Sequence, residues 1–206
     1  MNFFSTRGAG PVSLDEALRR GIAEDGGLYL PESLPLFEIV DFNNAESIPD
    51  VARVLLKPFF AGSVLESDIE EILEETFSFT IPTRELQVAD KSVALLELYH
   101  GPTAAFKDVG AGFLAACLTR LEGDVDSPLT ILVATSGDTG GAVAAAFDSR
   151  AGIRVAVLFP DGRVSARQEH QLCCWSDNIL SLKVKGSFDD CQLMVKAAMA
   201  DKELST

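Results

Sequence analysis

The sequence is short of basic residues. It contains 17 Lys and Arg against 31 Asp and Glu in 206 residues, which gives a formal net charge of −14. A surface with this charge repels phosphate groups, so the balance argues against a nucleic-acid partner and against docking on anionic lipid. With 47% hydrophobic and 23% charged residues, the composition is that of an ordinary globular protein, which excludes a disordered tail.

Metal-binding and redox motifs are also missing. The two histidines, His100 and His170, are far apart, and the four cysteines include no CxxC pair. A structural zinc site therefore lacks its usual spacing, and we expect no bound metal. Reduced thiols in a cytoplasmic protein are the simplest interpretation of the cysteines.

The sequence shows no membrane span and no export signal. Its first twenty residues lack a basic stretch followed by a long apolar one. The longest apolar runs, such as Leu129–Ala134 and Ala142–Phe147, are far too short to cross a bilayer. We therefore expect no membrane partner and a cytoplasmic location.

Residues 1–90 predict a small, mostly helical subdomain. Ser13 and Glu16 form a capping-box pattern, which predicts a helix through about Glu24 that ends at the following glycines. Ser67 and Glu70 form a second such pattern. The helix that follows has one apolar and one acidic face, and a solvated acidic face is a better interpretation than a metal site. Two further elements are expected: an extended segment at Leu28–Pro31 and a helix at Val51–Phe60.

The rest of the chain, residues 91–206, alternates between apolar runs and helical stretches. Buried strands are predicted at Ser92–Tyr99, Leu129–Thr135, Arg154–Phe159 and Ile179–Val184. Helices are predicted at Asp108–Leu121, Thr139–Asp148, Ser165–Cys174 and from a Ser187 cap through Ala200. This alternation predicts an α/β fold, with a parallel sheet covered by helices on both faces. Ligands of such sheets bind beyond the carboxyl ends of the strands, so we expect the chemistry in the strand-to-helix turns.

The first of these turns, His100–Asp108, contains a lysine at the mouth of a helix. Partial burial of Lys107 and the positive end of the helix dipole both favour the neutral amine. A neutral amine is what a Schiff-base or general-base lysine requires. An ordinary solvated lysine fits the position alone at least as well.

The second turn, Thr135–Gly141 (TSGDTGG), is rich in glycine. Its amides and hydroxyls at a helix N-terminus can bind an anion. It lacks the GK[ST] of a P-loop and the GxGxxG of a dinucleotide site. Simple helix capping by Asp138 and Thr139 is an equal alternative. The third turn, Pro160–Ser165, and the helix that follows it contain a locally basic stretch: Arg163, Arg167 and His170. A surface helix of mixed charge is a better interpretation of this stretch than a phosphate site.

Taken together, these segments resemble threonine synthase. His100–Gly110 (HGPTAAFKDVG) is similar to the cofactor-lysine segment of that family, and Ala134–Gly140 (ATSGDTG) is similar to its next signature. Four further segments fit the family in order: Ser5–Gly8, Asp25–Pro31, Phe159–Leu172 and Gly186–Val195. The resemblance thus covers the whole chain.

Threonine synthases are pyridoxal-phosphate (PLP) enzymes of the tryptophan-synthase-β type, fold type II. They convert O-phospho-L-homoserine and water to L-threonine and phosphate, the last step of threonine biosynthesis. The resemblance implies that Lys107 forms the Schiff base with PLP and moves protons, and that Asp138 serves the cofactor. It also implies that the rest of the turn binds the substrate carboxylate: Ser136, Gly137, Thr139 and Gly140.

Members of this family are considerably longer than 206 residues. The resemblance therefore implies an N-terminal portion, in which residues 1–90 are the N-terminal threonine synthase subdomain. Residues 91–206 would be an incomplete PLP-dependent domain without its cofactor-phosphate cradle, so we expect the chain alone to bind PLP weakly. Two alternatives remain open: a non-catalytic truncated fragment, and another PLP lyase of this fold, such as a threonine dehydratase.

Overall fold

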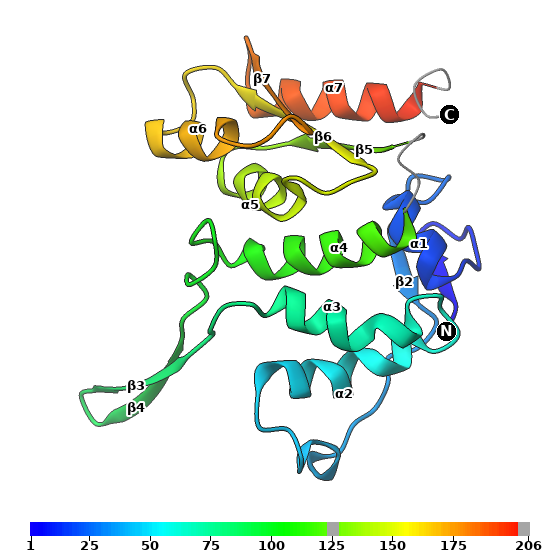
Figure 1. Ribbon diagram of the computed structural model, residues 1–206, viewed down its shortest axis with the longest axis vertical. Helices are drawn as coiled ribbons and strands as arrows, with labels where there is room; N and C mark the ends of the chain where they lie inside the picture. The colour runs from blue at the N-terminus through cyan, green and yellow to red at the C-terminus, as the bar shows by residue number, and fades with distance from the viewer. Residues whose placement is uncertain (123–127, 202–206) are drawn as a thin grey trace. The chain divides into compact units, whose positions relative to one another are not determined.

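The computed structural model describes residues 1–122 and 128–201 (Figure 1). The chain divides into two units. The first comprises Met1–Ser78 together with Ala116–Leu121. The second comprises Phe79–Ala115 together with the described residues from Glu122 on.

The first unit is mostly helical. A short antiparallel pair joins β1 (Phe3–Ser5) to β2 (Tyr29–Pro31). The helical elements are α1 (Leu14–Arg20), two 3₁₀ turns (Ile39–Phe42 and Glu66–Asp68), α2 (Ile48–Phe60), α3 (Ile69–Thr76) and the end of α4 (Lys107–Leu121). Helix α2 packs against α3. The centre of the unit is apolar, with side chains at most 2% exposed: Phe60, Leu65, Ile72 and Leu73.

Helix α1 begins where the sequence predicts and ends early. Ser13 is its N-cap, and the Ser13 Oγ accepts a hydrogen bond from the Glu16 amide at 3.1 Å. The predicted extension to Glu24 is wrong, because Gly21 takes a φ of 65° and its N–H bonds to the Ala17 carbonyl at 3.0 Å. A residue with positive φ ends a helix, and glycine adopts this conformation without a steric penalty.

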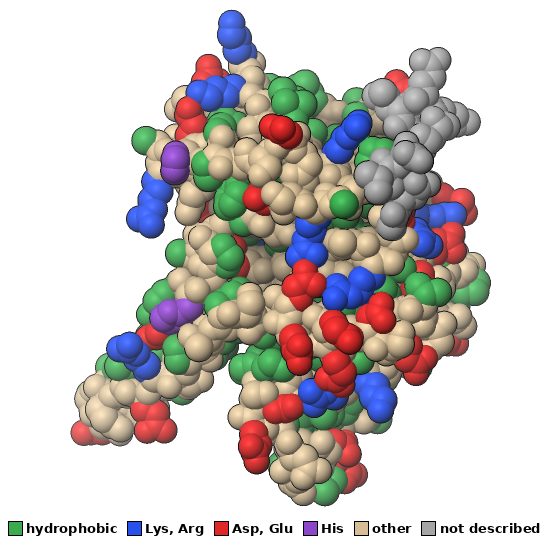
Figure 2. Space-filling view, viewed as in Figure 1, with side chains coloured by type: hydrophobic (Ala, Val, Ile, Leu, Met, Phe, Trp, Pro, Cys, Tyr) green, Lys and Arg blue, Asp and Glu red, His purple; other side chains and the backbone are tan. Residues whose placement is uncertain are grey.

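The acidic face of α3 lies in solvent, as predicted. Its exposed carboxylates are Glu70, Glu71, Glu74 and Glu75. Figure 2 shows acidic and basic side chains interspersed over this part of the surface. The predicted Ser67 cap is wrong, because Ser67 lies in the preceding 3₁₀ turn and Asp68 occupies the N-cap. Within the described ranges, no three His, Cys, Asp or Glu side chains are grouped so as to hold a metal ion.

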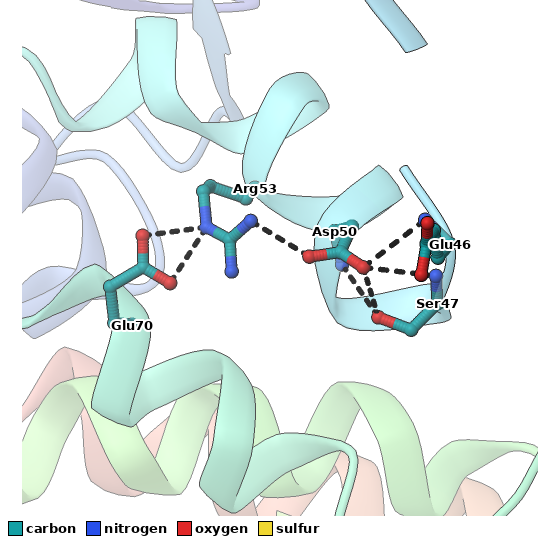
Figure 3. Close-up of polar contacts among 5 residues, drawn as sticks. All are labelled: Glu46, Ser47, Asp50, Arg53 and Glu70. Atoms are coloured by element: carbon teal, nitrogen blue, oxygen red, sulfur yellow. Dashed lines mark hydrogen bonds and ion pairs between the residues drawn. The ribbon is translucent and has the colours of Figure 1, made fainter. Parts of the chain in front are cut away.

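Arg53 joins α2 to α3 (Figure 3). Its Nε contacts the two carboxylate oxygens of Glu70 at 2.6 and 2.7 Å, and its Nη1 contacts Asp50 Oδ1 at 2.9 Å. The other oxygen of Asp50 accepts hydrogen bonds from the Ser47 amide at 3.0 Å and the Glu46 amide at 3.2 Å. The Ser47 hydroxyl also donates to it, and this bond, followed by that of Arg53, lowers the pKa of Asp50 to about 2.

Asp50 is expected to make the stability of α2 depend on pH. Its pKa in the folded chain lies below the ordinary 3.8, so the charged carboxylate stabilises the helix above about pH 4. That stabilisation is lost as the pH falls through about 2. Hydrogen exchange of the α2 amides, corrected for intrinsic rates, should show this loss in the unsubstituted chain and a much smaller one in Asp50→Asn. Equal losses in the two proteins would contradict the role of Asp50.

The second unit contains a parallel sheet of three strands. The strand order is β5 (Leu129–Ala134), β6 (Ile153–Pro160), β7 (Ile179–Val184). The helices are the start of α4, then α5 (Asp138–Phe147), α6 (Ala166–Cys173) and α7 (Phe188–Ala200). Helices α5 and α7 lie on opposite faces of the sheet (Figure 1), which confirms the predicted parallel sheet with helices on both faces. The central strand is the most buried, with side chains at most 1% exposed: Val155, Val157 and Phe159.

The prediction that Ser92–Tyr99 forms a buried strand of this sheet is wrong. Lys91–Leu96 form β4, which pairs antiparallel with β3 (Thr83–Val88) in a separate hairpin. Every residue of both strands is exposed. An apolar run predicts an extended segment but does not specify the strand with which it pairs. The turn that contains Lys107 therefore does not follow a strand of the parallel sheet.

All four cysteines are free thiols. Cys117 and Cys191 are buried, and burial raises the pKa of Cys117 to about 12. Cys173 and Cys174 are exposed. In the described part of the chain, no helix combines the length and the apolar character that crossing a bilayer would need.

Candidate active site

The turn before α4 is built around the buried carboxylate of Asp108, which is 5% exposed. Its Oδ2 accepts hydrogen bonds from the amides of Thr103 at 3.0 Å and Ala105 at 3.4 Å, and its Oδ1 accepts one from the Thr103 hydroxyl. A Cβ on Gly101 would lie 2.5 Å from Asp108 Oδ2, so only glycine fits there. Asp108, the residue after the candidate Lys107, thus fixes the turn that precedes α4.

Lys107 is the first residue of α4 and is half-buried. Its Nζ lies 4.4 Å from the centre of the Phe106 ring, within the range of a cation–π contact. Among the described residues, no carboxylate forms an ion pair with this Nζ. The amine is therefore held by an aromatic face and is available to a ligand.

Glu97 lies just before this turn and was not among the predicted site residues. It is 2% exposed, and its carboxylate contacts Arg84 Nε at 2.7 Å and His100 Nε2 at 2.7 Å. The hydrogen bond with His100, then that with Tyr99 and the charge of Arg84, lower the pKa of Glu97 against the opposing effect of desolvation. In the sequence, the only signal for this cluster of Glu97, Arg84 and His100 is that Glu97 is the single charged residue inside an apolar run.

The second turn is organised by Thr135, which is 1% exposed. The Thr135 Oγ1 accepts hydrogen bonds from the amides of Gly137 at 3.0 Å and Gly140 at 2.9 Å. Gly137 has a φ of 145°, a conformation that favours glycine. The two glycines thus shape the turn, while three of its side chains are exposed: Ser136, Asp138 and Thr139.

Gly140→Ala is expected to destabilise the second unit by about 1–3 kcal/mol, because the site is fully packed. The new Cβ would lie 2.5 Å from Thr135 Cγ2 and 2.8 Å from Leu172 Cδ2. Both of these side chains are at most 1% exposed and have no room to move aside. Urea unfolding followed by the fluorescence of Trp175, the single tryptophan, measures the stability of this unit.

Gly141→Ala is the matched control for this prediction. The Cβ at that position would meet nothing closer than Gln171 Cβ at 3.7 Å, an ordinary contact. Higher helix propensity should then stabilise α5 by up to about 1 kcal/mol. Equal unfolding midpoints for the two variants would contradict the packing of the turn.

One face of α6 contacts both turns. Gln168 Nε2 donates to Asp138 Oδ1 at 2.9 Å, and Gln171 Nε2 donates to the Thr103 carbonyl at 3.3 Å. Residues three apart lie on the same side of a helix, so the two glutamines act from one face. Within the described residues the two turns share no hydrogen bond with each other, and α6 is what connects them.

The predicted site residues therefore fall into two groups in the same unit. Lys107 begins α4, and the second group lies on the β5–α5 turn: Ser136, Gly137, Asp138, Thr139 and Gly140. The basic residues of the third turn and of the helix after it are exposed: Arg163, Arg167 and His170. The sequence did not single out Gln168 or Gln171, because a glutamine on a surface helix carries no signal of its partner.

Two family models match the chain. Residues 2–77 match a model described as threonine synthase N terminus, and residues 80–205 match one described as pyridoxal-phosphate dependent enzyme. The gap between the two matches contains the junction of the two structural units, at Ser78 and Phe79.

Curated relatives and solved structures agree with these two family models. The chain is 38% identical over 195 residues to a threonine synthase of Escherichia coli and 37% identical over 211 residues to one of Pseudomonas aeruginosa. These alignments cover 94% and 98% of this chain and 44% of each relative. Among solved structures, threonine synthase from Escherichia coli matches with a TM-score of 0.86 at 36% identity, over 99% of this chain and 47% of that one. PLP-bound threonine synthase from Brucella melitensis matches with a TM-score of 0.84 at 38% identity, over 98% of this chain and 45% of that one. The chain thus spans less than half the length of these relatives.

Proposed function

This chain belongs to the pyridoxal-phosphate dependent enzymes, and on that premise we propose that it acts in the threonine synthase reaction, as the N-terminal portion of such an enzyme. The substrates are O-phospho-L-homoserine and water, and the products are L-threonine and phosphate. The small-molecule partner is therefore a phosphorylated amino acid. The cytoplasm is the proposed location.

One observation carries the proposal: a single face of α6 holds both candidate turns, through Gln168 to Asp138 and through Gln171 to Thr103. A lysine amine without a carboxylate partner and a glycine-rich helix N-terminus are thereby attached to the same helix. A PLP enzyme that acts on an amino acid needs these two functions together. The amine binds the cofactor aldehyde, and the helix N-terminus binds the substrate carboxylate.

The residues present fit PLP on this side of the site. Lys107 Nζ lies against the Phe106 ring at 4.4 Å and forms no ion pair with a described carboxylate, so it is free to bind the aldehyde. Lys107 would hold the cofactor covalently, and Asp138 would contact it from the second turn through Oδ2, since its Oδ1 accepts from Gln168. When bound, PLP supplies an electron sink for the negative charge that develops at the substrate Cα.

Proton transfer and substrate binding would be carried out by side chains of this chain. Once the substrate's own amine has displaced it, Lys107 Nζ would take protons from the substrate Cα and Cβ and return protons to Cγ and Cα, while phosphate leaves Cγ and the hydroxyl of water adds at Cβ. The exposed hydroxyls of Ser136 and Thr139 bind the substrate carboxylate at the positive end of α5. Gly137 and Gly140 would serve the substrate site by shaping the turn that presents these hydroxyls, since their own amides bind Thr135 Oγ1.

We also propose a two-part organisation into an N-terminal subdomain and a PLP-dependent domain, for which the sequence predicted the ranges 1–90 and 91–206. The junction of the structural units near residue 78 favours a division somewhat earlier than residue 90. The hairpin β3–β4 then belongs with the PLP-dependent domain.

Product analysis tests the function. The purified chain is incubated with PLP and either O-phospho-L-homoserine or L-threonine. Phosphate and L-threonine formed from the first substrate would support the proposal. Ammonia and a keto acid formed from the second would identify a threonine dehydratase instead. If neither reaction occurs although PLP is bound, the chain is a non-catalytic fragment and the proposed activity is wrong for it.

A further inference from the structure

Both the oxygen and the nitrogen of the Gln168 side-chain amide form hydrogen bonds. Gln168 is the third residue of α6, and its Oε1 accepts hydrogen bonds from the Ser165 amide at 3.0 Å and the Ser165 hydroxyl at 2.9 Å. The Ser165 Oγ in turn accepts from the Gln168 amide at 3.2 Å, which completes a capping box. The other end of the side chain, Nε2, donates to Asp138 Oδ1 at 2.9 Å. One residue thus caps α6 and binds the first residue of α5.

The backbone of the second turn is fitted to this side chain. A Cβ on Gly137 would lie 2.4 Å from Gln168 Nε2 and 2.7 Å from its Cδ. The Gln168 amide therefore rests directly on the turn, and Gly137 leaves the space for it. Gln168 itself is half-buried, so solvent only partly competes for the hydrogen bond to Asp138.

The placement of Asp138 matters because of its charge. A carboxylate in the first turn of a helix interacts favourably with the helix dipole, as an anionic ligand at the same place would. Asp138 would therefore compete with a substrate carboxylate for the amides and hydroxyls at the start of α5. The hydrogen bond from Gln168 holds the Asp138 carboxylate toward α6 instead.

We propose that Gln168 is a positioning residue for the substrate site: it holds Asp138 toward α6 and so leaves the start of α5 accessible to the substrate carboxylate. This rests on the proposed function. Either Glu or Gln satisfies a capping box, because both supply the oxygen that accepts from the N-cap. Only Gln also supplies the donor that Asp138 accepts, so the neutral residue is required at this position.

Gln168→Glu separates the two roles of the side chain. The carboxylate keeps the cap of α6, and it faces Asp138 with a second negative charge in place of a donor. Hydrogen exchange of residues 136–141 is expected to become about tenfold faster or more, the change that follows from losing a hydrogen bond to a charged group. Exchange within α6 is expected to stay as it was, because the capping box survives.

The double variant Gln168→Glu with Asp138→Asn is the rescue. The new amide at position 138 donates to the new carboxylate at position 168, so protection of residues 136–141 should return toward that of the unsubstituted chain. Unchanged exchange of these residues in Gln168→Glu would overturn the proposal. So would equally fast exchange in the single and double variants.

Substrate binding is read in the same experiment by adding O-phospho-L-homoserine in the presence of PLP. The substrate should slow the exchange of residues 136–141, and Gln168→Glu should need at least several-fold more substrate for half of this effect. If Gln168→Glu loosens the turn but binds substrate as before, the positioning role is wrong. If the unsubstituted chain gains no protection from the substrate, the proposed function fails, and the ligand-free comparison still decides whether Gln168 holds Asp138.

Discussion

Lys107→Ala is expected to reduce phosphate release from O-phospho-L-homoserine by roughly 10²–10⁴-fold, the range associated with loss of a proton-transferring side chain. The reason is that Lys107 is the only described lysine that begins a helix in the unit that contains the candidate substrate turn. The free energy of unfolding should change by less than about 1 kcal/mol, because only the contact with the Phe106 ring is lost. Activity is measured with excess PLP, and stability by urea unfolding.

Lys107→Arg is the control for charge. It keeps a cation over the Phe106 ring, but a guanidinium stays protonated and neither binds an aldehyde nor exchanges protons near neutral pH. We expect Lys107→Arg to be as inactive as Lys107→Ala. Substantial phosphate release by either variant would show that Lys107 is not the reacting amine.

Asp108→Ala is expected to destabilise the second unit by about 3–5 kcal/mol. The Asp108 carboxylate is 5% exposed. It accepts hydrogen bonds from the amide and the hydroxyl of Thr103 and from the amide of Ala105. Removing it leaves the donors of Thr103, itself 8% exposed, without an acceptor in the interior. Trp175 fluorescence during urea unfolding reports on this unit.

Thr103→Val is the matched control for the Asp108 variant. It removes only the hydroxyl donor and keeps the backbone hydrogen bond at 3.0 Å, so we expect a loss of about 1–2 kcal/mol. A destabilisation by Asp108→Ala no larger than that of Thr103→Val would contradict the central role of the carboxylate. It would then follow that the turn before Lys107 is fixed by other contacts.

Much of the second unit was predictable from the sequence, because short stretches of neighbouring residues determine its strands and helix starts. Continuous apolar runs predicted the three parallel strands, and Ser165 and Ser187 marked the starts of α6 and α7. The hairpin β3–β4 was not predictable in the same way. Its second strand has the apolar content of a buried strand, and only the tertiary structure shows that it pairs with Thr83–Val88.

The candidate site likewise has a part that could be predicted from the sequence and a part that could not. The lysine and the glycine-rich turn carry their own sequence signals, because each lies where an extended segment gives way to a helix. The groups that hold these turns act over long separations. Gln168 binds a residue 30 positions away, and Gln171 binds one 68 positions away. Nothing in a single sequence links such pairs.

The central claim is that Lys107 is the amine that binds PLP. The most direct measurement is borohydride reduction of the chain with excess PLP, followed by digestion and mass spectrometry of the seven lysines. We predict that PLP, even if bound weakly, is fixed predominantly to Lys107, and that O-phospho-L-homoserine suppresses this labelling. Label scattered over the other lysines, or none on Lys107, would contradict the assignment of this turn as the cofactor site.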